Sequence, residues 1–75
     1  MAELPVLRPR EVVRALERAG FFIHHQAGSH AVLRHRTEAA LRVTVPMHAR
    51  DLKRGTLRAI VRSAGMSVEE FVDLL

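Results

Sequence analysis

Apolar side chains recur at helical spacing near the start of the chain, at Val12, Val13, Leu16 and Ala19. Polar residues fill the positions between them, so the segment has one apolar and one polar face, as an amphipathic helix does. Pro9 suits the first helical position, where its missing N–H has no partner to lose, and Gly20 suits a left-handed stop. The pattern predicts a helix over residues 9–19.

Three extended segments follow. Residues 21–25 are aromatic and β-branched, and residues 30–35 resume an extended pattern after a tight turn at residues 27–29. Residues 41–45 alternate apolar and polar positions, which places the odd-numbered residues on a buried face. Pro46 ends this segment, because proline cannot donate a hydrogen bond to a strand ladder. The three segments predict an antiparallel meander.

A basic loop over residues 46–55 precedes the last helical patterns. Thr56 is expected to cap a helix that ends at Gly65. The apolar stripe of this helix consists of Leu57, Ile60, Val61 and Ala64. Ser67 and Glu70 have the spacing of a capping box, which predicts a short final helix. The apolar positions of that helix are Val68, Phe71, Val72 and Leu75.

The predicted order of elements is therefore α-β-β-β-α-α, an α+β fold with a three-stranded antiparallel sheet. Both main helices are expected on one face of the sheet, because so small a sheet needs something to pack against. Residues 1–75 form one domain, and residues 1–7 are expected to be a flexible segment. Val32 and Leu33 are both apolar, so alternation leaves the buried face of the second strand open.

Composition narrows the class of protein. Apolar residues make up 48% of the 75 positions, enough for one modest core. The chain has neither an apolar run of the about 20 residues that a membrane span needs nor a signal-peptide core, so it is expected to be cytoplasmic. The absence of cysteine excludes disulfides and thiolate chemistry. The net charge is +4, and almost all of the positive charge comes from arginine. Such a charge indicates a nucleic-acid or an acidic protein partner. Many solvated protein surfaces carry a similar charge.

Five histidines are candidates for chemistry: His24, His25, His30, His35 and His48. A zinc site is disfavoured, because His24 and His25 are neighbours on a strand and should point to opposite faces. His24, His25 and His35 are read as half-exposed polar residues, whereas His48 either packs at the sheet edge or lines a site. The three phenylalanines, Phe21, Phe22 and Phe71, fit a core better than a base-stacking surface.

His30 differs because it follows Gly28 and Ser29 directly. Glycine lets the backbone turn tightly and approach a ligand, and the serine hydroxyl can donate or accept. In RNA the neighbouring 2′-OH is itself a nucleophile, so cleavage needs only an acid–base group near neutral pH and positive charge. His30 is a candidate for the first, and Arg34, on the same strand face by parity, is a candidate for the second.

The chain resembles the HicA family of bacterial mRNA interferases, the toxins of toxin–antitoxin pairs. The matching stretches are AGFF, QAGSH, RVTVPMH and DLKRGTLRAIVRSAGMSVEEF, which cover the chain from about Arg8 to its end. The resemblance implies a fold like the double-stranded-RNA-binding domain and metal-independent RNA cleavage without a cofactor. It implies catalysis by the histidine of the Gly-Ser-His turn, which is His30 here, and a HicB-type antitoxin that covers the active face.

Two positions depart from the family pattern, and at one of them Leu33 replaces a bulky aromatic. Ala27 stands where members commonly carry a cation, which favours two alternatives: a non-catalytic double-stranded-RNA-binding module or a protein-interaction domain. The Gly-Ser-His turn favours the enzyme. The residues expected to contact RNA are Gly28, Ser29, Arg34, Arg36, His48, Arg50, Lys53 and Arg54.

Overall fold

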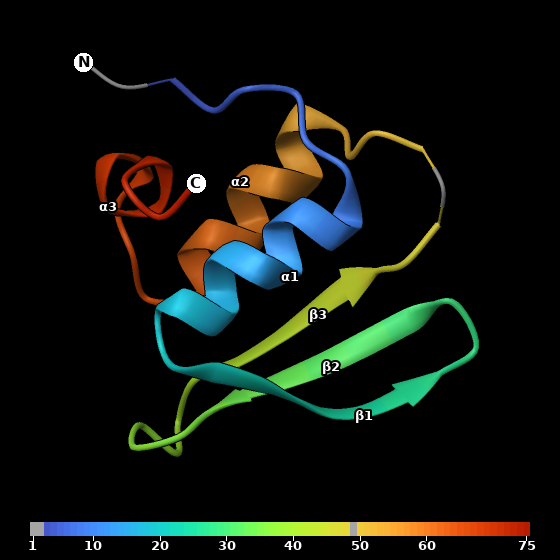
Figure 1. Ribbon diagram of the computed structural model, residues 1–75, viewed down its shortest axis with the longest axis vertical. Coiled ribbons are helices and arrows are strands. Elements are labelled where there is room, and N and C mark those ends of the chain that lie inside the picture. Colours follow the sequence, from blue (N-terminus) through green and yellow to red (C-terminus); the bar gives the residue numbers. More distant parts are fainter. Residues whose placement is uncertain (1–2, 49) are drawn as a thin grey trace.

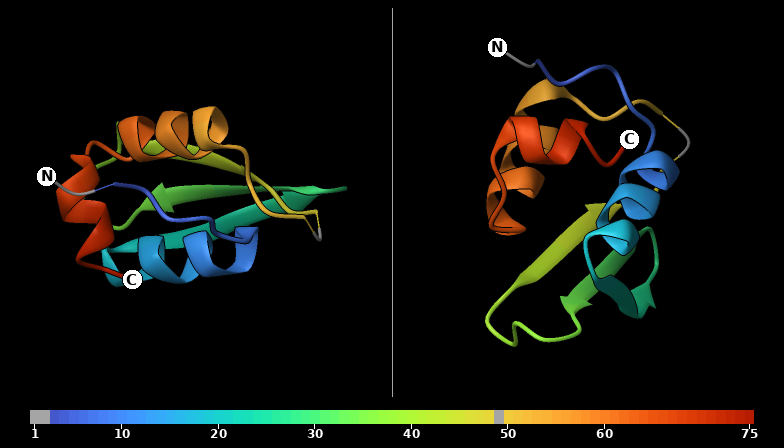
Figure 2. Two further views of the ribbon diagram at one scale, coloured as in Figure 1. Left: turned by 90° about the horizontal axis from the view of Figure 1, so that it is seen from above. Right: turned by 60° about the vertical axis from the view of Figure 1, so that its left-hand side comes forward.

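The computed structural model describes residues 3–48 and 50–75 and has the predicted order of elements. Strands β1, β2 and β3 form an antiparallel sheet in that order. Helices α1 and α2 lie side by side on one face of the sheet, and α3 packs at the end of α2 (Figures 1 and 2). The α+β fold expected from the sequence is therefore confirmed. The bounds are α1 Pro9–Arg18, β1 Phe21–Ala27, β2 His30–His35, β3 Arg42–Pro46, α2 Arg54–Ser63 and α3 Val68–Val72.

The hydrophobic core lies between the sheet and the two long helices. The buried residues of the sheet in this core are Phe21, Ala31, Leu33, Val43 and Val45. Those of the helical stripes are Val12, Val13, Leu16, Leu57, Ile60, Val61 and Ala64. Leu33 therefore faces the helices, whereas Val32 pairs with Thr44 on the outer face of the sheet and stands outside the core cluster. The structure thus shows which face of the second strand is buried, a question that the alternation of apolar residues left open: it is the face of Ala31 and Leu33.

The N-terminal segment contributes to this core. Residues 1–2 lie outside the described part of the chain, and residues 3–7 form no helix or strand. The segment was expected to be flexible, yet Leu4 and Leu7 are only 4% and 6% exposed. The backbone N–H of Leu52 donates to the Leu7 carbonyl at 2.8 Å. The segment thus packs against the loop that leads into α2.

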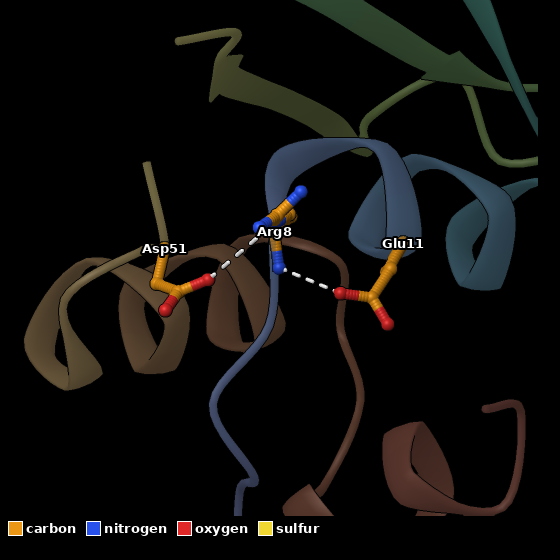
Figure 3. A network of polar contacts seen from close by, with 3 residues as sticks. All are labelled: Arg8, Glu11 and Asp51. Carbon is orange, nitrogen blue, oxygen red and sulfur yellow. Dashed lines mark hydrogen bonds and ion pairs between the residues drawn. The ribbon is translucent and has the colours of Figure 1, made fainter. Parts of the chain in front are cut away.

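Arg8 connects this segment to the start of α1 and to the loop before α2 (Figure 3). Its backbone N–H donates to the Glu11 carboxylate at 2.9 Å, which satisfies one free donor at the start of α1. Its side-chain Nε lies 3.8 Å from Asp51 Oδ1, in the loop before α2. Both side chains of that pair are well exposed, so we expect the ion pair itself to add little stability.

Strand β1 carries a bulge that the sequence did not reveal. The pairing register shifts between Ile23 and His25, so His24 is an extra residue opposite β2. The prediction that His24 and His25 point to opposite faces is wrong, because their Nδ1 atoms lie 3.0 Å apart. The assignment of Phe22 to the core is also wrong: it is half-buried and pairs with Arg34 on the outer face.

Helix α2 begins three residues earlier than expected. Arg54 is its first residue and Lys53 its N-cap, so Thr56 lies inside the first turn and does not cap the helix. Leu52 explains the early start, because its buried side chain and its hydrogen bond to Leu7 fix the chain just before the helix. No side chain caps this end.

The end of α2 and the start of α3 follow the sequence prediction. Gly65 adopts a left-handed φ of +74°. Ser67 and Glu70 form the predicted capping box: each side chain accepts from the other's backbone N–H. The hydrogen bond from the Ser67 backbone holds the pKa of the Glu70 carboxyl below its usual range. Leu75 lies beyond α3 and is exposed.

His35 is a structural residue and not merely a half-exposed polar one. Its Nε2 lies 2.9 Å from the Ala19 carbonyl, which can only accept, so Nε2 carries the proton. Its Nδ1 accepts from the backbone N–H groups of Thr37 and Glu38 at 3.2 and 3.1 Å. A Cβ on Gly20 would come within 2.7 Å of this ring, so the close approach requires glycine. His35 thereby joins the end of α1 to the β2–β3 connection.

We expect His35→Ala to lower the free energy of unfolding by about 1–3 kcal/mol, because two donors and one acceptor lose their partner. Thermal unfolding followed by circular dichroism measures this loss. His25→Ala is the matched control, since His25 is an exposed strand histidine whose ring contacts only its neighbour His24 among the described hydrogen bonds. Equal thermal midpoints for the two variants would contradict the structural role of His35.

Candidate nucleic-acid interface

A two-residue turn joins β1 to β2. Ala27 and His30 are paired across it, so Gly28 and Ser29 form the whole connection. Gly28 has a φ of +58°, in the left-handed region that favours glycine. A Cβ at Gly28 would meet no atom within 4 Å, so the glycine serves the backbone conformation of the turn and leaves its outer surface open.

His30 sits directly after this turn on a backbone that is held on both sides. It is the first residue of β2, the central strand, and pairs with Ala27 on β1 and Pro46 on β3. The Ser29 carbonyl accepts a hydrogen bond from the backbone N–H of Met47, which continues the ladder past Pro46. The His30 side chain itself is exposed. The arrangement presents an imidazole to solvent from a fixed backbone position.

The beginnings of both long helices lie at the same end of the molecule as this turn (Figure 2, left). His48 lies between two shallow hollows there. One is lined by Arg8, Pro9, Arg10, Glu11, Met47 and His48. The other is lined by Pro46, His48, Arg50, Asp51, Leu52, Lys53 and Thr56. His48 is exposed and lines both hollows, and its part in a site stays a prediction.

Positive charge gathers around the two hollows. The five cations at this end are Arg8, Arg10, Arg50, Lys53 and Arg54. The first turn of α2 contains no acidic residue and no side-chain cap. Backbone N–H groups at a helix start, together with side-chain cations, favour bound phosphate groups. Arg8 and Arg10 were not among the predicted site residues. The feature of the sequence that could have indicated them is a pair of arginines on either side of Pro9, the first residue of α1.

Arg34 and Arg36 lie elsewhere on the sheet. Arg34 shares the outer face with His30, as parity predicted, but four residues along a strand span about 13 Å. Its guanidinium donates to the Ala39 carbonyl at 3.3 Å, in the β2–β3 connection. The Arg36 guanidinium lies over the Phe22 ring, 5.5 Å from its centroid. The predicted site residues therefore fall into two groups, one at each end of β2.

The described histidines do not assemble a metal centre. Within residues 3–48 and 50–75, no group of three or more histidine and carboxylate side chains is placed to hold a metal ion. His35 is engaged with backbone groups, and the His24–His25 contact has no third ligand in that part of the chain. The charged groups around the two hollows are imidazole, guanidinium, ammonium and carboxylate.

Comparison with protein families gives a match over most of the chain. A family model described as the HicA toxin of bacterial toxin–antitoxin matches residues 9–66. That range includes the turn, His30, His48 and the basic start of α2. No curated protein matches the chain. Among the described residues, no helix has both the length and the apolar character needed to cross a membrane.

Proposed function

The chain belongs to the HicA toxin family of bacterial toxin–antitoxin systems, and we propose on that premise that it is an endoribonuclease that cleaves mRNA. The family implies a cognate antitoxin partner. In the proposal, His30 is the acid–base group and the antitoxin is of the HicB type. The cations around His48 hold the RNA backbone.

The observation that carries the proposal is the position of His30. An exposed imidazole on a strand-fixed backbone, one residue after an open glycine turn, can meet a phosphodiester without rearrangement of the fold. The 2′-OH next to the scissile phosphate attacks, so no protein nucleophile is needed. Histidine exchanges a proton near neutral pH and suits the transfer to or from the reacting oxygens.

The surroundings of His30 supply the remaining requirements in this proposal. Gly28 leaves room for a phosphate to approach the turn, and Ser29 offers a hydroxyl and a backbone N–H beside it. Arg50, Lys53 and Arg54 provide positive charge at the start of α2 for phosphates next to the scissile bond. His48 lies between these cations and Arg8 and contacts the same stretch of RNA.

Cleavage without metal tests the proposal directly. We expect the purified protein to cleave RNA in excess EDTA and to leave 2′,3′-cyclic or 3′-phosphate ends, because the 2′-OH is the nucleophile. Gel analysis of end-labelled RNA identifies both the cleavage and the ends. Binding without cleavage would instead support the non-catalytic RNA-binding module, and a requirement for added Mg²⁺ or Zn²⁺ would refute the metal-independent mechanism.

The basic start of α2 gives a second test. Replacing Arg50, Lys53 and Arg54 by alanine together should weaken RNA binding and flatten its salt dependence by about 2 units of slope, since each lost phosphate contact changes the slope by about 0.7. Fluorescence anisotropy at several salt concentrations measures both effects. The charge-matched control replaces the exposed helix residues Arg14, Arg58 and Arg62. An equal change of slope in the control would attribute the effect to net charge alone.

A further inference from the structure

The outer face of the sheet carries unbalanced positive charge at the end away from the turn. Arg34 on β2 and Arg42 on β3 are direct cross-strand partners, with side chains on the same face. Like charges in this arrangement destabilise a sheet. None of the three strands contains an Asp or Glu, so the sheet offers no carboxylate to offset the repulsion. The Arg34 guanidinium donates to the Ala39 carbonyl at 3.3 Å, which leaves the positive charge of the pair in place, and a bound anion would offset it.

An aromatic ring lies beside this pair. Phe22 on β1 is the cross-strand partner of Arg34 on the other side, so Phe22, Arg34 and Arg42 form one row across the outer face. Phe22 is only half-buried, although phenylalanine is usually core. The Arg36 guanidinium lies 5.5 Å from its ring centroid. Arginines beside an accessible aromatic ring are the combination with which proteins hold single-stranded nucleic acid.

The row is separate from the catalytic turn. It lies about 13 Å from His30 along β2, too far for both to contact one phosphodiester group. Both lie on the same outer face, with Val32 and Thr44 between them. A flexible strand of RNA bound at His30 can continue along this face to the arginines. A rigid duplex cannot offer Phe22 an unpaired base, because its bases are stacked inside the helix.

We propose that Phe22, Arg34, Arg36 and Arg42 form a second RNA subsite, which makes single-stranded RNA the preferred substrate. Arg34 and Arg42 hold phosphate, and the Phe22–Arg36 pair stacks an unpaired base. The inference rests on the proposed function in that RNA is the substrate. It adds a binding step remote from the scissile bond, so substrates too short to reach the row bind less tightly.

Equilibrium binding of an RNA that the protein cannot cleave tests the subsite. The probe is a labelled 2′-O-methyl RNA of about 12 nucleotides, within the site sizes of small single-strand-binding domains, free or annealed to its complement. We expect Arg34→Ala/Arg42→Ala to weaken binding of the single strand at least about tenfold, as loss of two charge-assisted contacts should. Phe22→Leu should weaken it by about 5- to 100-fold. The control Arg14→Ala/Arg62→Ala, with the same loss of charge on exposed helix positions, should retain affinity.

A stability measurement separates a lost contact from a damaged fold. Arg42→Thr removes the like-charge opposition, so its thermal midpoint should rise while its affinity for the single strand falls. Equal affinities for the wild type and the Arg34/Arg42 variant would overturn the subsite, as would an equal loss in the control or an equal loss for the duplex. Unchanged RNA binding with weakened antitoxin binding would assign the row to the antitoxin. The probe reports binding whether or not the wild type cleaves RNA, so failure of the proposed activity is recorded separately, by the cleavage assay.

Discussion

His30→Ala is expected to lower the rate of RNA cleavage by about 10²–10⁴-fold, the usual contribution of a positioned acid–base group. The fold should survive, because the His30 side chain is exposed and the strand pairing around it uses only backbone groups. Cleavage of a labelled RNA under single-turnover conditions measures the loss, and circular dichroism checks the fold. Affinity for uncleavable RNA should change much less than the rate.

His25→Ala is the matched control for this experiment. His25 is another exposed histidine of the outer face, opposite Val32, and has no role in the proposed chemistry. A general effect of losing an imidazole from the sheet would slow both variants equally. If His30→Ala cleaves RNA at the wild-type rate, His30 has no part in the mechanism, and the acid–base group must be sought around His48.

The sequence predicted the helices and the order of strands because burial is periodic. The stripe of α2, from Leu57 to Ala64, is buried as expected, and the alternation of β3 places Val43 and Val45 in the core. The Gly-Ser-His turn was also predictable, since a positive φ and a two-residue connection require glycine. These features depend on residues close together in the chain.

Contacts between distant residues were not predictable in this way. Leu7 and Leu52 meet across the fold, and no local pattern indicates that this contact fixes the start of α2. The bulge at His24 follows from pairing with β2, which alternation within β1 cannot reveal. The contact between Leu7 and Leu52 overrides the preference of Thr56 for a helix cap. The pairing of β1 with β2 overrides the alternation of faces expected along β1.

In the candidate site, too, the features set by neighbouring residues were predictable and the contacts between distant residues were not. The local part, from Gly28 to His30, was proposed from sequence alone and lies within the residues that the family model matches. Parity placed Arg34 on the correct face but gave no distance, and the strand rise separates it from His30. Arg8 and Arg10 reach the site only because α1 begins beside His48. Sequence reasoning therefore found the catalyst candidate and missed part of its charged surroundings.

A stoichiometric amount of the cognate antitoxin is expected to abolish RNA cleavage, because a free ribonuclease would damage its own cell. The proposed block is steric: an acidic antitoxin surface covers the end of the sheet that bears His30 and Arg54. The net charge of +4 favours this encounter, since complementary charge raises association rates by up to about 10³-fold at low salt. The residual rate of cleavage should be proportional to the concentration of toxin that is not bound to antitoxin.

Hydrogen exchange on the free and bound protein locates the covered surface. Protection is expected at residues 28–30 and over residues 50–54, with contact to at least one of Arg34, Arg36 and Arg54. Lys53→Glu/Arg54→Glu should slow association, whereas the same reversal at Arg58 and Arg62 should have much less effect. Protection confined to residues 10–18, along the exposed face of α1, would contradict the steric block even for a tight complex. Inhibition would then have to act through the conformation of the turn, because His30 would remain open to RNA.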